Sequence, residues 1–223
     1  MNRLIPILLV ALIAVAGGGY WYSQSSGVAP GVTNVEVVSS EGAADVDTSG
    51  VVEMSIGAED APITMIEYAS FTCPHCASFH DTVYKQLKID YIDTGKVKFI
   101  FRDVYFDRFG LWASMVARCG GQERFFGITE LLMSSQDEWA RAGEPVAIAD
   151  ALRKTGRLAG LEDAQLQACL QDEDKAKALI AWYQTNASAD DISGTPTLII
   201  DGEKHSNMSY SDLRDILDAK LDG

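Results

Sequence analysis

Two cysteines two residues apart lie where an apolar run meets a helical pattern. The run at residues 63–69, Ile-Thr-Met-Ile-Glu-Tyr-Ala, is typical of a buried strand, and Cys73 and Cys76 follow it in the segment Ser-Phe-Thr-Cys-Pro-His-Cys. Apolar residues then recur at four-residue steps, which predicts a helix (Phe79, Val83, Leu87 and Tyr91). We therefore expect Cys73 at a strand-to-helix junction, with Pro74 in the first turn, where a missing N–H costs nothing.

A thiol at the start of a helix is chemically activated. The helix N-terminus favours negative charge, so an exposed Cys73 ionises readily, and the thiolate is the form that attacks disulfides. A cationic or hydrogen-bonding His75 would stabilise this thiolate and make the disulfide more oxidising. The alternative is that Pro74 only begins a helix and that His75 is an exposed polar residue. Cys76 is expected to be shielded and to act as the resolving thiol.

A Cys-x-x-Cys motif has two other interpretations, an inert structural disulfide and half of a zinc site. A zinc site needs two more soft ligands at matching spacing. The remaining cysteines, Cys119 and Cys169, are solitary and far apart, and the chain has only three histidines (His75, His80 and His205). The strand-to-helix context favours a catalytic dithiol, with no metal and no cofactor beyond a redox-active disulfide.

Three segments resemble the DsbA family of thioredoxin-fold oxidoreductases. Residues 67–76, Glu-Tyr-Ala-Ser-Phe-Thr-Cys-Pro-His-Cys, resemble its active-site segment. Residues 193–197, Ser-Gly-Thr-Pro-Thr, followed by Leu-Ile-Ile-Asp-Gly, resemble its cis-proline loop and the strand after it. The largely helical stretch between them matches the family's helical insertion. The resemblance covers roughly 51–221 and implies an α/β, thioredoxin-like fold: a central mixed sheet flanked by helices, with a helical domain inserted at about 109–190.

The residue patterns predict elements in an order that fits this fold. They are an edge strand at 51–54, a buried strand at 63–70, a helix from about 74 to 93, a parallel strand at 97–102, the helical insert, a strand at 197–201, a turn at Asp201-Gly202, a short strand near Lys204 and a helix at 211–221.

The resemblance assigns substrate binding to Thr195 and Pro196. It implies a cis Thr195–Pro196 bond packed against Cys73 and Cys76, which leaves the Thr195 backbone free to pair with an extended substrate peptide. An ordinary trans proline at the start of a strand is the alternative. Threonine before the cis proline departs from the most oxidising pattern of the family and also occurs in isomerases.

Glu67 interrupts the apolar strand six residues before Cys73. Burying a carboxylate without a partner is costly, so a surface-facing position is one interpretation. The other, which the resemblance favours, is a buried acid beneath the dithiol that relays protons as Cys76 attacks or leaves. His80, one turn beyond Cys76, is interpreted as a partly buried helix residue rather than a proton donor.

Cys119 and Cys169 both lie in the predicted insert. The resemblance implies a second, structural disulfide between them, and an exported chain rarely keeps spare thiols. Two buried free thiols are the alternative. A disulfide that closes a loop of about 50 residues would stabilise the fold by roughly 4 kcal/mol in the chain-entropy model.

The N-terminal region has the composition of an export element. Arg3 is the only charged residue before Glu36, and the uncharged span 4–22 would reach ~28 Å as a helix, close to the thickness of a hydrocarbon core. We favour an uncleaved anchor at 1–22, although Ala-Val-Ala at 14–16 is also a small-x-small cleavage site. A flexible linker at 23–50 and an oxidoreductase domain at 51–223 would follow. This predicts a location in the bacterial periplasm, tethered to the inner membrane or cleaved and soluble.

The negative net charge of the chain argues against nucleic acid as a partner. With 32 Asp+Glu against 18 Lys+Arg, the net charge of −14 repels phosphate backbones, so we expect no nucleic-acid partner. The expected partners are unfolded or reduced exported proteins, and the resemblance adds a DsbB-like membrane quinone reductase for reoxidation. We expect a monomer.

These observations predict an exported thiol:disulfide oxidoreductase that introduces disulfides into substrate proteins. A disulfide isomerase or reductase of the same fold is the first alternative, because the motif alone does not set the direction of exchange. A non-catalytic chaperone of the same fold is the second. Isomerases of the DsbC kind carry an N-terminal dimerisation domain, for which 23–50 is too short and too polar.

Overall fold

A five-stranded mixed sheet forms the centre of the molecule. The computed structural model describes residues 46–223. The strands lie in the order β1-β3-β2-β4-β5, with β2 and β3 parallel and the other neighbours antiparallel. Their bounds are β1 (Met54–Ile56), β2 (Ile63–Ala69), β3 (Val97–Asp103), β4 (Thr197–Ile200) and β5 (Glu203–Ser206).

The chain between β2 and β3 forms a continuous helical crossover. It alternates α-helix and π-helix as α2 (Pro74–Phe79), η2 (His80–Tyr84), α3 (Lys85–Leu87) and η3 (Lys88–Ile92). The predicted helix at about 74–93 and its two flanking parallel strands are confirmed to within one residue at each boundary. The apolar residues at four-residue steps are buried, so this helix lies on the sheet along their side.

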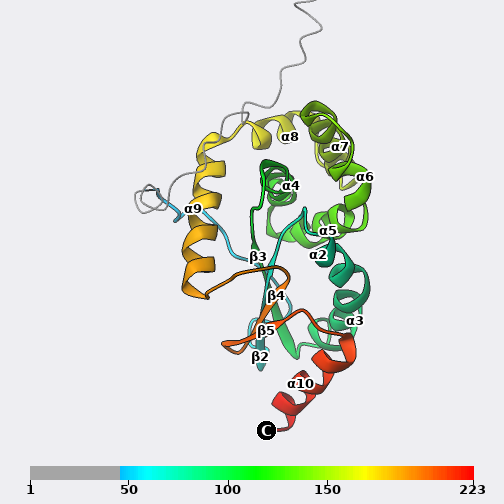
Figure 1. Ribbon diagram of the computed structural model, residues 1–223, viewed down its shortest axis with the longest axis vertical. Coiled ribbons are helices and arrows are strands. Elements are labelled where there is room, and N and C mark those ends of the chain that lie inside the picture. Colours follow the sequence, from blue (N-terminus) through cyan, green and yellow to red (C-terminus); the bar gives the residue numbers. More distant parts are fainter. Residues whose placement is uncertain (1–45) are drawn as a thin grey trace, which may run out of the picture.

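A run of helices lies between β3 and β4. They are α4 (Arg108–Cys119), α5 (Gly121–Ser134), α6 (Gln136–Ala140), α7 (Pro145–Leu158), α8 (Asp163–Leu170) and α9 (Glu173–Ala189). Helices α4 to α8 gather at one end of the sheet, and α9 runs back along its side (Figure 1). Large buried side chains of the insert, such as Trp112, Phe125 and Trp139, belong to the same apolar core as the sheet and the crossover helix.

Strand β2 is covered on both faces. Met65 and Ala69 belong to the main core beneath the crossover helix, whereas Tyr68 belongs to a second cluster that includes Ala187 of α9. Successive residues of a strand point to opposite faces, so Glu67 shares the face of Met65 and Ala69. A surface-facing position for Glu67 is therefore wrong, because helices cover that face as well.

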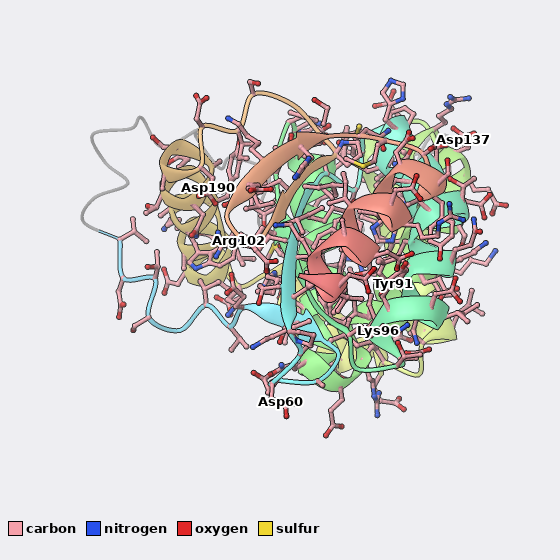
Figure 2. The ribbon with its side chains drawn as sticks, turned by 90° about the horizontal axis from the view of Figure 1, so that it is seen from below. Asp60, Tyr91, Lys96, Arg102, Asp137 and Asp190 are labelled. Atoms are coloured by element: carbon pink, nitrogen blue, oxygen red, sulfur yellow. A yellow bond between two sulfur atoms is a disulfide. The ribbon has the colours of Figure 1, made fainter. Side chains whose placement is uncertain are left out.

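A polar cluster holds α9 against the sheet. The Arg102 guanidinium donates to the Tyr68 hydroxyl (2.8 Å) and to the Asp190 carboxylate (3.1 Å), and the Tyr68 hydroxyl also donates to Asp190. Figure 2 shows Arg102 and Asp190 beside each other where α9 approaches the sheet. These contacts connect the end of the insert to strands β2 and β3.

The first strand begins later than predicted. We expected an edge strand at 51–54, but the pairing with β3 starts at Met54. The Val52 carbonyl instead accepts a hydrogen bond from Arg118 at 2.8 Å, and the Glu53 carboxylate pairs with Arg102. A long-range side-chain donor thus takes the Val52 carbonyl, a backbone group that a longer strand could have used.

The chain ends in a hairpin and a helix, as predicted. Asp201 and Gly202 both have positive φ, +48° and +84°, which matches the two-residue turn that joins β4 to β5. Helix α10 (Tyr210–Asp222) begins after Ser209, whose hydroxyl accepts from the Asp212 N–H. The Tyr91 hydroxyl donates to Asp218 at 2.6 Å and fastens α10 to the far end of the crossover helix.

The expected anchor at 1–22 and most of the linker at 23–50 lie outside the described residues. Within residues 46–223, none of the helices combines the length and the apolar character needed to span a membrane. The end of the linker contacts the domain, because the Gly50 carbonyl accepts from Lys175 at 3.0 Å.

Candidate active site

Cys73 is the N-cap of α2, as the strand-to-helix junction predicted. Its backbone is extended (φ −87°, ψ 117°), Pro74 occupies the first turn, and the Cys73 carbonyl accepts from the N–H groups of Cys76 (3.1 Å) and Ala77 (3.2 Å). Both motif cysteines are free thiols, Cys73 8% exposed and Cys76 fully buried. Both cysteines are therefore buried, so the exposed Cys73 expected from the sequence is wrong, and Cys73 keeps the larger exposed fraction of the two.

The pKa values of the two thiols are shifted in opposite directions. The pKa of Cys73 is lowered to about 5, mainly because the Cys76 thiol donates a hydrogen bond to it. Burial raises this pKa, whereas the Thr195 hydroxyl and the backbone N–H groups of Cys76 and His75 lower it further. The pKa of Cys76 is raised strongly because its proton is held by Cys73, and because burial and the charge of Glu67 disfavour a second anion. The site thus separates an ionised outer sulfur from a protonated inner one.

Pro74 and His75 have exposed side chains. From the sequence we expected the His75 imidazole to stabilise the thiolate. In the structure His75 contributes through its backbone N–H. The influence of the imidazole on the redox equilibrium stays a prediction.

The loop before β4 lies against the outer sulfur. The Thr195–Pro196 peptide bond is cis, so the trans alternative is wrong. The Cys73 sulfur is 3.5 Å from the Thr195 carbonyl oxygen. The Thr195 hydroxyl oxygen is buried and has no hydrogen-bond partner in the described part of the chain, although it lowers the pKa of Cys73. This is expected if the hydroxyl turns its proton towards the sulfur when that sulfur ionises.

Glu67 pairs with His80 beneath the dithiol. The His80 Nε2 atom is 2.8 Å from Glu67 Oε2, and both side chains are buried, with exposed fractions of 4% and 0%. The other atom of each group, Glu67 Oε1 and His80 Nδ1, has no hydrogen-bond partner in residues 46–223. The partly buried position that we expected for His80 is wrong, because the rings of Phe79, Tyr84 and Phe101 surround its imidazole.

Gln136 is a site residue that the sequence did not reveal. It is the first residue of α6 in the insert, and its amide nitrogen donates to the carbonyls of Phe71 (2.8 Å) and Cys73 (2.9 Å). In the sequence, a glutamine that stands among other polar residues at the start of a short helix gives no indication of such a role.

A second contact from the insert reaches the same segment. Asp107 is the N-cap of α4 and accepts from the N–H groups of Phe109 and Gly110. Its other carboxylate oxygen accepts from the Thr72 hydroxyl at 2.8 Å, next to Cys73. The helical insert therefore forms hydrogen bonds both with the backbone and with a side chain of the segment before Pro74.

Cys119 and Cys169 form a disulfide, with an S–S distance of 2.07 Å, between the last residue of α4 and the end of α8. The alternative of two free thiols is therefore wrong. In the described part of the chain, no group of three or more His, Cys, Asp or Glu side chains converges as a metal site.

The fold and the site together define a thioredoxin-fold protein with a helical insert, an acidic outer cysteine and a cis proline beside it. A family model described as Thioredoxin matches residues 49–219, so the chain belongs to this family. Its fold is that of the DsbA proteins: a crystal structure of Wolbachia pipientis alpha-DsbA1 covers 81% of this chain and 94% of its own, with a TM-score of 0.70 and 27% identity.

Other relatives carry names of the same kind. A crystal structure of a protein-disulfide isomerase from Novosphingobium aromaticivorans is 26% identical, with a TM-score of 0.69, and covers 77% of this chain and 98% of its own. "Putative protein-disulfide oxidoreductase" of Rickettsia bellii is 30% identical over 171 residues, or 76% of this chain. Disulfide bond formation protein D of Bacillus subtilis is 25% identical over 177 residues and covers 75% of this chain and 77% of its own length. The chain spans 65% of the length of the Rickettsia protein.

Proposed function

We propose that this protein is an exported thiol:disulfide oxidoreductase that introduces disulfides into substrate proteins through Cys73 and Cys76. The observation that carries the proposal is the asymmetry of the two thiols: Cys73 is less deeply buried and has a pKa of about 5, whereas Cys76 is fully buried and its pKa is raised. A stable Cys73 thiolate favours the reduced enzyme, so the oxidised form passes its disulfide on readily.

The reaction is thiol–disulfide exchange in two steps. A substrate thiolate attacks the Cys73 sulfur of the oxidised pair, the Cys73–Cys76 bond breaks, and Cys76 leaves and takes up a proton. A second substrate thiolate then attacks the substrate sulfur of the mixed disulfide, and Cys73 leaves as a thiolate. Two electrons pass from the substrate dithiol to the enzyme, and a low pKa makes Cys73 a good leaving group in the second step.

Glu67 is the proposed proton donor and acceptor for Cys76. The charge of its carboxylate contributes to raising the pKa of the Cys76 thiol, and its buried Oε1 atom has no hydrogen-bond partner in the described chain. Thr195 and Pro196 are the proposed substrate-binding residues. Their loop borders the Cys73 sulfur, where the Thr195 backbone can pair with an extended peptide.

The proposed location and partners rest on the N-terminal sequence and on the resemblance to the DsbA family. We assign the protein to the bacterial periplasm, held at the inner membrane by 4–22 or released from it by cleavage, and acting on reduced exported proteins. A DsbB-like membrane quinone reductase would reoxidise it. An isomerase or reductase role is the second candidate, favoured by threonine before the cis proline and by the isomerase name of the Novosphingobium protein.

The equilibrium of Cys73 and Cys76 with glutathione tests the proposal. We expect the disulfide to be reduced at far lower glutathione concentrations than that of thioredoxin, and the oxidised protein to form a disulfide in a reduced model peptide. A potential as reducing as that of thioredoxin, about −270 mV, would favour the reductase candidate instead.

A further inference from the structure

The side chain of Gln136 bridges the helical insert to the segment that carries the nucleophile. It is 5% exposed, and both of its hydrogen bonds, to the Phe71 and Cys73 carbonyls, are buried. The partners are separated from it by 65 and 63 positions along the chain. A buried carbonyl that loses its donor costs about 1–3 kcal/mol, so these bonds hold their partners firmly in place.

The Cys73 carbonyl is the group that sets the cap geometry. It accepts from Gln136 as well as from the N–H groups of Cys76 and Ala77, which close the first turn of α2. The Phe71 carbonyl, two residues earlier, is held by the same amide. With both carbonyls held, the Cys73 sulfur stays at the start of α2, where the Cys76 thiol and the backbone N–H groups of Cys76 and His75 lower its pKa.

We propose that Gln136 is a positioning residue for the nucleophile: its two hydrogen bonds hold Cys73 in the N-cap conformation and make the reactivity of its sulfur depend on where the insert lies. This inference rests on the proposed function, in which Cys73 is the attacking sulfur. Gln136 touches neither sulfur and acts through the backbone of residues 71–73.

The test compares two glutamines of the insert in the full-length protein. Gln136→Met removes both donors at similar volume. Gln165→Met is the matched control, because the Gln165 amide nitrogen also donates to a cysteine carbonyl, that of Cys119, at 2.9 Å. For each reduced variant, thiolate absorbance is titrated against pH, the glutathione equilibrium is measured, and thermal unfolding is followed separately.

We expect Gln136→Met to raise the pKa of Cys73, with at least a roughly twofold loss of thiolate at pH 5 and a matching shift of the equilibrium towards the disulfide. Gln165→Met should leave both readouts as in the native protein. Earlier melting of Gln136→Met with an unchanged thiolate titration would overturn the proposal, because Gln136 would then be a structural residue only.

A second variant covers the case in which Gln136→Met does not fold. Gln136→Glu keeps the shape of the side chain, but its ionised form has no donor and adds a negative charge near the thiolate. The proposal requires its Cys73 pKa to exceed that of the native protein, and an unchanged pKa would refute it. If the native protein itself ionises at Cys76 first, the proposed function fails instead, and the two failures are distinguishable.

Discussion

At the scale of single residues, hydrogen bonds and burial shift the pKa values of two chemically identical thiols in opposite directions. Cys73 accepts from the Cys76 thiol, the Thr195 hydroxyl and two backbone N–H groups, whereas the proton of Cys76 is held by Cys73 in a dry interior near the Glu67 carboxylate. Desolvation disfavours the anion at both sulfurs, and only Cys73 has enough donors to overcome it.

The first prediction concerns which sulfur attacks. Cys73→Ser should abolish exchange, and Cys76→Ser should trap mixed disulfides through Cys73, because the resolving thiol is gone. In the reduced native protein, iodoacetamide at mildly acidic pH should label Cys73 first, since its pKa is about 5. Peptide mapping by mass spectrometry gives the order, and the assignment is wrong if Cys76 is labelled earlier.

The second prediction is a pH dependence of stability in the reduced form. The pKa of Cys73 is about 5 in the folded protein and about 8.5 when unfolded, so between these values the unfolded chain binds one more proton. The contribution of Cys73 to the free energy of unfolding therefore rises with pH, by up to about 1.4 kcal/mol per pH unit. It is fully present above about pH 8.5 and is lost as the pH falls through about 5.

Urea unfolding of reduced native protein and of reduced Cys73→Ser across this pH range measures the difference. The other titrating groups contribute to both proteins, so the difference between the two curves isolates Cys73. The variant should lack the rise in unfolding free energy with pH. Parallel curves for the two proteins would show that Cys73 is not ionised in the native state.

The third prediction concerns the buried pair of Glu67 and His80. His80→Leu leaves a buried carboxylate without its partner and should cost about 3–5 kcal/mol of unfolding free energy. The double variant with Glu67→Leu should recover much of this loss, because no unpaired charge remains.

Urea unfolding of the oxidised proteins gives these energies. The exposed pair of Lys85 and Asp81 on the same helix is the control, since its side chains are at least half exposed and Lys85→Leu should change little. A double variant that loses as much unfolding free energy as His80→Leu, or more, would contradict the expected recovery.

At the scale of elements, the Cys119–Cys169 bond joins two helices of the insert and stands apart from the reactive pair. It closes a loop of 50 residues in the sequence. We predict that Cys119→Ser/Cys169→Ser loses about 4 kcal/mol of stability in the chain-entropy model and still oxidises a model peptide.

Thermal unfolding and peptide oxidation of the folded double variant test this prediction side by side. A variant that folds fully but no longer catalyses exchange would place this disulfide in turnover rather than in stability.

At the scale of the whole molecule, the sheet and the insert meet at the active site. Gln136 and Asp107 reach it from the insert, Thr195 comes from the loop before β4, and Glu67 lies on β2. All of them fall within residues 46–223, together with both reactive cysteines.

The fifth prediction follows from this arrangement. A fragment of residues 46–223 should match the full chain in its glutathione equilibrium and in its rate of peptide oxidation in solution, because every group assigned to the chemistry is present. Kinetics of both proteins on one reduced peptide give the comparison. A slower fragment with a native melting profile would assign part of the chemistry or of substrate binding to 1–45.

The sequence by itself determined the local architecture around the reactive thiol. An apolar run, a Cys-Pro-His-Cys junction and four-residue periodicity specify a strand followed by a helix, and Asp201-Gly202 specifies the hairpin turn. These features depend on backbone preferences and on burial of one helix face, which neighbouring residues encode. The cis Thr195–Pro196 bond and the Cys119–Cys169 pairing came from a resemblance, because no local pattern distinguishes them from their alternatives.

Tertiary structure alone decided which polar groups meet. The partner of Glu67 is His80, the side-chain donor to the Cys73 carbonyl is Gln136, and the Val52 carbonyl is taken by Arg118 instead of extending β1. Each of these bonds joins residues on different elements, and the residue types involved can satisfy their hydrogen bonds equally well with water. Only the packing of the insert and of the crossover helix against the sheet removes that water and makes each partner necessary.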